Sequence, residues 1–135
     1  MSRVEYNEDY TWGQIRWAGA AKRAIYGRPG QAFLRELREA LLALPEPKLI
    51  ADDFITSAGE VCALGAVAKA RDVDMSGIDS DEDVANRLGI TYTLAWEIMS
   101  QNDGLGLGPY GITVSPEQRY LHVLQWVESH IEATE

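Results

Sequence analysis

The sequence lacks the features that mark exported, disulfide-linked or membrane-spanning proteins. It has one cysteine, Cys62, so no disulfide bond can form within the chain. No segment approaches the roughly 20 apolar residues that a transmembrane helix needs. The first residues, MSRVEYNEDYTWG, contain no apolar stretch of the kind found in secretory signals. We therefore expect a cytoplasmic protein.

Motifs that carry catalytic or metal chemistry are also scarce. His122 and His130 stand eight residues apart on one expected helix, and the pattern offers no third zinc ligand. Cys62 lies in an apolar run, where a cysteine is more often buried than nucleophilic. The glycine-rich segment 104–111 follows a helix rather than a strand and lacks the lysine of a phosphate-binding loop. We expect no enzyme, no cofactor and no metal site.

Positive charge is scarce in the second half of the chain. The formal net charge is −9, yet residues 72–135 hold only Arg87 and Arg119 against twelve acidic residues. Residues 10–38 have the opposite balance, with six basic residues and one acidic residue. An acidic surface attracts basic partners and repels nucleic acid, and it also keeps a protein soluble. The interpretation we prefer for the basic stretch is pairing with part of the acidic half.

Helical periodicity dominates what the sequence does contain. Apolar residues recur at helical spacing and predict the helices 12–25, 31–44, 60–70, 81–88, 92–101 and a last helix from 116 to the chain end. A turn is expected over 27–30, and the segment near 49–55 fits either a small two-stranded β element or a turn of helix. The predicted fold is mainly α, a compact domain of five to six helices over 1–135, with an irregular segment over 1–10.

Two helix starts carry clear signals. Ser115 is followed by proline at the first helical position and by glutamine at the third, which predicts a capping box. Ser80, with Asp83 three residues later, predicts a similar start for the helix 81–88, and Gly89 is expected to end that helix.

The segment 72–83 (DVDMSGIDSDED) is the densest acidic stretch. We expect its carboxylates to form the partner-binding surface, through Asp72, Asp74, Asp79, Asp81, Glu82 and Asp83. The spacing also nearly matches a calcium loop, with Asp72 first, Gly77 sixth and Asp83 twelfth. Because Asp83 replaces the usual glutamate and the loop is single, we prefer a solvated loop that leads into a helix cap.

Nucleic-acid binding is the alternative. Residues 81–98 match the small, turn and core positions of a helix-turn-helix, but the second helix has no lysine or arginine to neutralise phosphates. The stretch 16–38 interleaves aromatic and basic residues, as surfaces that bind single strands do. The alternative protein is thus a small helix-turn-helix-like regulator that binds through a basic face, formed by Arg16, Lys22, Arg23 and Arg28.

Most of residues 24–131 resemble a family of small proteins encoded by phages and prophages. The resemblance is carried by GRPGQAFLRELREALLALPEPKLIA, EVCALGAVAKARDVDMSGID, VSPEQRYLHVLQWVESHI and the position of Trp126. It implies no established activity and no catalytic residue. The expectation is a non-enzymatic accessory protein that binds a host macromolecule with a basic surface. A concrete form is an inhibitor of a host defence complex such as a CRISPR effector, whose basic channel would accept an acidic surface.

Overall fold

The computed structural model describes residues 8–104 and 114–133, and it describes side chains from residue 16 onward. Six helices make up this part of the chain: α2 (Glu8–Tyr26), α3 (Arg28–Leu42), α4 (Ala63–Arg71), α5 (Asp81–Leu88), α6 (Tyr92–Asn102) and α7 (Pro116–His130). There is no β-sheet among the described residues; residues 55 and 61 form a single antiparallel bridge. The prediction of a mainly α, compact domain of five to six helices is confirmed.

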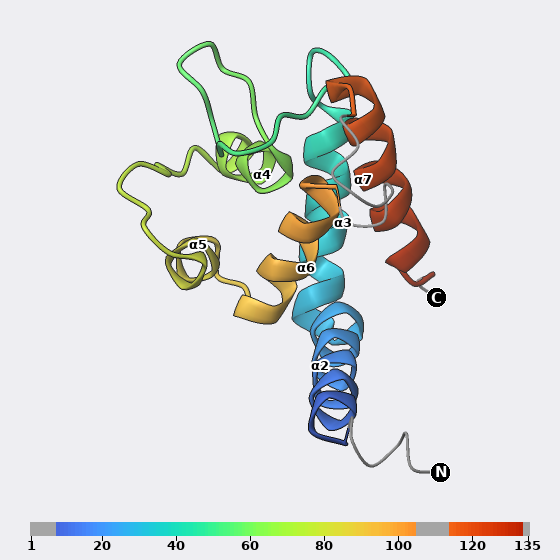
Figure 1. The fold of residues 1–135 in the computed structure, drawn as a ribbon. Coiled ribbons are helices and arrows are strands. Elements are labelled where there is room, and N and C mark those ends of the chain that lie inside the picture. Colours follow the sequence, from blue (N-terminus) through green and yellow to red (C-terminus); the bar gives the residue numbers. More distant parts are fainter. Residues whose placement is uncertain (1–7, 105–113, 134–135) are drawn as a thin grey trace.

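The helices surround two central elements, α3 and α6. Helix α3 contacts α2, α4 and α7, while α6 contacts α2, α4, α5 and α7. Figure 1 shows α2 continuing from the N-terminal end of α3, α7 along one side, and α4 and α5 on the opposite side. Helix α5 lies at the edge and packs mainly against α6.

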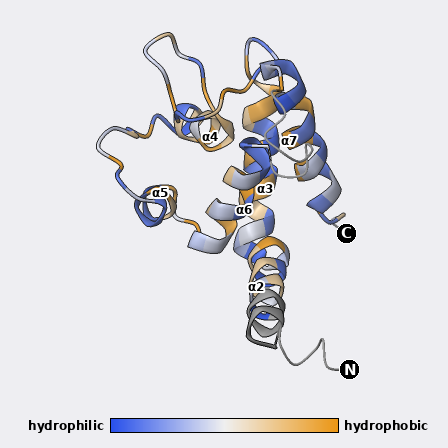
Figure 2. Ribbon diagram, in the orientation of Figure 1, coloured by the Kyte–Doolittle hydropathy of each residue, from blue (hydrophilic) through white to orange (hydrophobic). Residues whose placement is uncertain are grey.

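The core follows from the apolar spacing on α3. Leu34, Leu37 and Leu41 recur three and four residues apart, so they share one face, and all three are fully buried. They belong to one cluster with Leu64 of α4 and Val123 of α7. In Figure 2 the hydrophobic colour lies on the inner faces of these helices and the hydrophilic colour on the outer faces. Burial of this cluster is the main source of stability.

A buried glutamine joins three helix ends. The side-chain nitrogen of Gln31 donates to the backbone oxygens of Ile25 and His130, and its oxygen accepts from the backbone nitrogen of Glu132. These bonds connect α3 to the C-terminal ends of α2 and α7. Because Gln31 is only 6% exposed, each bond forms where water cannot replace it easily.

A buried asparagine joins the end of α6 to two other segments of the chain. Asn102 Oδ1 accepts from the backbone nitrogen of Ala63, the first residue of α4, at 2.9 Å. Asn102 Nδ2 donates to the backbone oxygen of Ile50 at 3.0 Å. The asparagine therefore fixes the start of α4 and the segment before it to the end of α6.

Several predicted boundaries are wrong. The turn expected over 27–30 shrinks to Gly27, because Pro29 fits the first turn of a helix and α3 already begins at Arg28. The helix expected over 60–70 begins only at Ala63, since Val61 pairs with Ile55 in the antiparallel bridge. Helix α2 includes residues 8–10, which we expected to be irregular; acidic residues such as Glu8 and Asp9 are favoured in the first turn of a helix. Helix α7 ends at His130, whereas we expected it to continue to the chain end.

The predicted capping signals are confirmed. Ser115 and Gln118 form a complete capping box at the start of α7. Ser80 Oγ accepts from the backbone nitrogen of Asp83 at the start of α5. Gly89 ends α5 with φ of 72°, a left-handed conformation that glycine adopts without strain.

Parts of two predicted segments lie outside the described residues. These are residues 1–7 of the expected irregular N-terminal segment and residues 105–111 of the glycine-rich segment. Among the described helices, none combines the length and the apolar character required to cross a bilayer.

Candidate functional site

The acidic segment after α4 combines apolar residues that pack on the core with exposed carboxylates. Met75 is buried, and Val73 and Ile78 are half-buried against the core, whereas Asp72 and Asp74, on either side of Val73, are exposed. Asp72 ends α4 in a left-handed conformation, with φ of 59°, which turns the chain away from the helix. The apolar residues therefore hold this segment on the core while its acidic residues face the solvent.

Arg87 of α5 fastens the same segment from outside the core. Its guanidinium donates to the backbone oxygens of Asp74 and Ser76, at 3.0 and 2.6 Å, and approaches the Asp83 carboxylate at 3.4 Å. The backbone nitrogen of Ser76 donates to Asp74 Oδ1 at 2.9 Å. This hydrogen bond is the main cause that lowers the pKa of Asp74 below its ordinary value. The segment is thus held in one shape.

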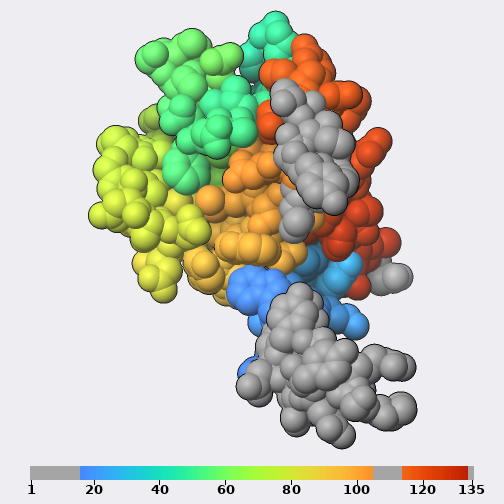
Figure 3. All heavy atoms as spheres, viewed as in Figure 1, coloured from blue at the N-terminus to red at the C-terminus, as the bar shows by residue number. Residues whose placement is uncertain are grey.

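The remaining predicted acidic residues lie in or just before the first turn of α5. Asp79, Asp81 and Glu82 are exposed, and Asp83 is half-buried. Negative charge in a first turn is favoured by the helix dipole. We call the set of Asp72, Asp74, Asp79, Asp81, Glu82 and Asp83 the acidic patch. In Figure 3 the yellow-green surface of residues 72–88 forms one edge of the molecule, and no other segment covers that edge in this view.

The arrangement does not resemble a calcium loop. Asp83, the twelfth position of the pattern, is paired with Arg87, a cation that would compete with a metal ion for its carboxylate. Within residues 16–104 and 114–133, no three His, Cys, Asp or Glu side chains form a group that could hold a metal. His122 and His130 contact Gln101 and the backbone oxygen of Trp126, respectively.

The arginine that precedes the acidic patch is directed away from it. Arg71 forms two hydrogen bonds to the Glu36 carboxylate, at 2.6 and 2.7 Å, and one to the backbone oxygen of Leu88. Its guanidinium also lies 5.6 Å from the centre of the Phe33 ring. The bond to Arg71 is the main cause that lowers the pKa of Glu36 below its ordinary value. Arg71 is therefore engaged with α3 and does not neutralise the patch.

The predicted basic face is exposed along α2 and the start of α3. Its residues Arg16, Lys22, Arg23 and Arg28 are all exposed and form no ion pair within the described part of the chain. Further along α3, Arg38 pairs with Glu128 of α7 at 2.9 Å, and Arg35 donates to the backbone oxygen of Glu132. Pairing of the basic stretch with the acidic half is seen with the C-terminal region and not with the acidic patch.

The predicted helix pair at 81–98 exists, but α2 covers part of its second helix. Helices α5 and α6 are joined by residues 89–91, and α6 contacts four other helices. Trp17 of α2 donates to the Glu97 carboxylate at 3.0 Å and stacks edge-on against Trp96 at 5.3 Å. A recognition helix must enter a DNA groove, and the contacts with α2 obstruct that face of α6.

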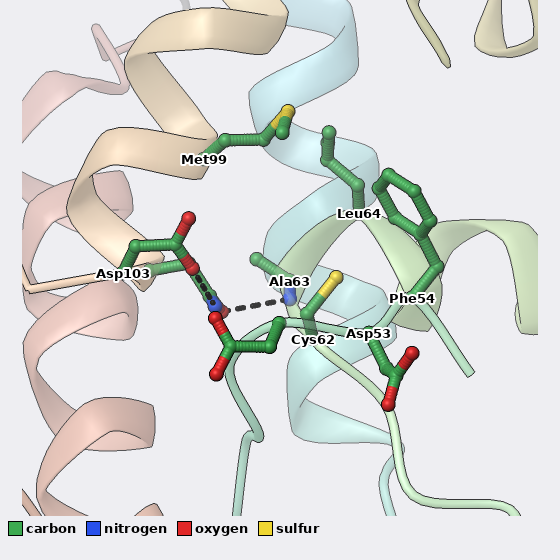
Figure 4. Close-up of a pocket in the computed structure, with 9 residues that line it drawn as sticks. Asp53, Phe54, Cys62, Ala63, Leu64, Met99 and Asp103 are labelled. Atoms are coloured by element: carbon green, nitrogen blue, oxygen red, sulfur yellow. Dashed lines mark hydrogen bonds between the residues drawn. The ribbon is translucent and has the colours of Figure 1, made fainter. Parts of the chain in front are cut away.

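Sequence reasoning missed a second acidic feature, which depends on residues far apart in the chain. A cavity of about 170 Å³ lies between residues 52–54, the start of α4 and the end of α6. Figure 4 shows Phe54, Leu64 and Met99 on one side of it, with Asp53 and Asp103 flanking the other. The adjacent Asp52 and Asp53 were the only local signal, and the approach of Asp103 is set by tertiary structure.

Comparison of the chain with protein-family models, curated proteins and solved structures finds no match in any of the three.

Proposed function

We propose that this protein is a binding module that presents a pre-formed acidic surface to a basic partner protein. The observation that carries the proposal is the acidic patch itself. Five of its six residues are exposed. Only Asp83 is in an ion pair in the described structure.

The fixed shape of the patch supports this function over a merely solvated loop. Ordering a flexible segment on binding costs conformational free energy, so a segment that is already ordered binds more tightly for the same contacts. Met75 holds the segment from the inside and Arg87 holds it from the outside. A surface needed only for solubility gains nothing from these constraints.

The proposed partner is a nucleic-acid-handling complex of a host cell, such as a CRISPR effector. The resemblance to phage and prophage proteins motivates the choice of host, and charge motivates the choice of surface. A channel that binds the nucleic-acid backbone is lined with basic side chains. An acidic protein surface with well-placed carboxylates is complementary to such a channel.

The test compares two variants with equal loss of charge. The patch variant replaces all six patch residues by asparagine or glutamine, and the control variant replaces six glutamates elsewhere by glutamine: Glu39, Glu46, Glu60, Glu117, Glu128 and Glu132. Each variant loses six negative charges from a formal charge of −9. The wild-type protein and both variants are used to capture proteins from host lysate at low and then high salt, with mass spectrometry of the retained proteins.

We expect the wild-type protein and the control variant to retain the same salt-labile protein with a basic groove. The patch variant should release it, because the charges that attract it are gone. Equal retention by the patch variant would show that another surface binds. Retention of nucleic acid alone, or of no specific protein, would refute the proposed function. Far-ultraviolet circular dichroism of each variant confirms that it is folded.

A further inference from the structure

The cavity beside the end of α6 combines an apolar wall with an acidic rim. Phe54, Leu64 and Met99 supply the wall, and all three are at least half-buried. The carboxylates of Asp52, Asp53 and Asp103 lie at the exposed rim. Within the described part of the chain, none of the three carboxylates forms an ion pair. The charge at the rim is therefore left uncompensated.

The cavity is suited to a cation and not to an anion. It lies at the start of α4, where free backbone N–H groups would ordinarily attract an anion. Here the backbone nitrogen of Ala63 donates to Asn102, and that of Gly65 donates to the Cys62 sulfur. With these donors occupied and three carboxylates at the rim, a negatively charged ligand is repelled.

The same residues connect the cavity to the acidic patch. Met99 and Asp103 also line a neighbouring hollow on the surface of α6, whose opposite side is formed by Asp81 of α5. In Figure 3 the orange surface of α6 borders both the yellow-green surface that carries the patch and the green segment before α4. A partner that contacts the patch can therefore reach the cavity without crossing another element.

We propose that this cavity binds the side chain of a lysine of the basic partner. The four-carbon stem of lysine is apolar and would pack against Phe54, Leu64 and Met99, while its ammonium group would remain at the acidic rim. The ammonium carries three donors on a narrow stem, whereas arginine carries a broad, planar guanidinium. A cavity of about 170 Å³ has room for the whole four-carbon stem. This inference rests on the proposed function for the identity of the partner but not for the chemistry of the site.

The experiment uses n-butylammonium, which reproduces the lysine side chain and requires no partner. The chain has three methionines, so a sample labelled with ¹³C in the methionine methyl groups gives three NMR signals. Met99 lines the cavity and Met75 is buried outside it, so Met75 is an internal control. We expect n-butylammonium to shift the Met99 signal saturably and to leave Met75 unchanged. Butyrate and n-butanol, which share the stem but lack the positive charge, should shift Met99 at least about tenfold more weakly.

Variants test whether the three carboxylates at the rim bind the ammonium group. The triple variant Asp52→Asn, Asp53→Asn and Asp103→Asn should weaken n-butylammonium binding at least about fivefold, because it removes the rim charge and keeps the side-chain shape. The matched control Glu39→Gln, Glu46→Gln and Glu117→Gln, which lies outside the cavity, should bind as the wild-type protein does. Equal binding by the triple variant, equal binding of n-butanol, or no shift of Met99 would overturn the proposal. Tighter binding of n-propylguanidinium would overturn the assignment to lysine.

The outcome is separable from that of the lysate experiment. If Met99 does not respond while the patch variant still loses its partner, the cavity proposal fails and the proposed function stands. If n-butylammonium binds while no basic partner is captured, the cavity is a cation site and the proposed function fails.

Discussion

Replacing Asn102 by alanine tests whether one buried amide fixes the start of α4. Asn102 is 2% exposed, and its side chain bonds to the backbone of both Ala63 and Ile50. Alanine removes both partners at once and leaves a buried backbone N–H and a backbone C=O without a protein partner. Each buried group that loses its partner costs about 1–3 kcal/mol, so the expected loss for the two groups is about 2–6 kcal/mol. That is a large part of the stability of about 5–15 kcal/mol that small domains have.

The assay is urea unfolding followed by circular dichroism at the helical band. We expect the unfolding midpoint of Asn102→Ala to fall by about 1–3 M urea, given slopes of about 1–3 kcal/mol per M for small proteins. The matched control is Asn86→Ala, which makes the same substitution on the exposed face of α5. It should change stability by less than about 0.5 kcal/mol. If Asn102→Ala costs no more than Asn86→Ala, water replaces the amide without loss and the assigned role is wrong.

Three further predictions follow from single contacts. Gly65→Ala should destabilise the fold by several kcal/mol in the same urea assay, because the added methyl group would overlap the backbone oxygen of Phe54; Gly19→Ala, which has room, should not. Burial raises the pKa of the Cys62 thiol from 9.0 to about 11, so its reaction with a thiol reagent at pH 8 should be about a hundredfold slower than in urea; equal rates would contradict its burial. The ion pair with Arg71 lowers the pKa of Glu36 in the folded protein, so its contribution to folding stability is fully present above pH 4.5 and is lost as the pH falls through the lower pKa of the folded state. The free energy of unfolding, measured as a function of pH, should therefore fall less on acidification for Glu36→Gln than for the wild-type protein. Identical pH profiles would refute that contribution.

Local signals in the sequence were sufficient for the helix ends that carry a capping residue and insufficient for close approaches between helices. Ser115, Ser80 and Gly89 act on neighbouring backbone groups, so the chain around them determines the outcome. Gly30 looked like part of a turn because glycine and proline occur together. In the structure it is buried in α3 against the backbone of Ala24, where a side chain would not fit. Ala24 lies only six residues before Gly30, but the contact depends on α3 beginning at Arg28, directly after α2, where we expected a turn.

The acidic patch and the cavity also differ in how far the sequence predicts them. The patch is continuous in sequence, so its residues could be named from the sequence, although its anchoring by Arg87 could not. The cavity joins Asp52 and Asp53 to Asp103, about 50 residues later, through the packing of α4 against α6. The start of α4 was misplaced because a buried extended segment and a buried helix have the same apolar composition. Periodicity over so few residues does not distinguish the two.

The uneven charge of the molecule follows from how the fold uses its arginines. Arg71 and Arg87 donate to backbone oxygens of neighbouring segments, and Arg119 donates to the backbone oxygen of Asn102. These three cations therefore stabilise the fold and, among the described residues, pair with only Asp83 of the acidic patch, whose carboxylates stay largely exposed and repel one another. Salt weakens such repulsion and equally weakens attraction to a partner. We therefore expect added salt to raise the melting temperature of the wild-type protein and to lower its affinity for a basic partner. The patch variant should lose both responses. A melting temperature of the wild-type protein that falls with salt would mean that internal ion pairs, such as that of Arg71 with Glu36, outweigh the repulsion.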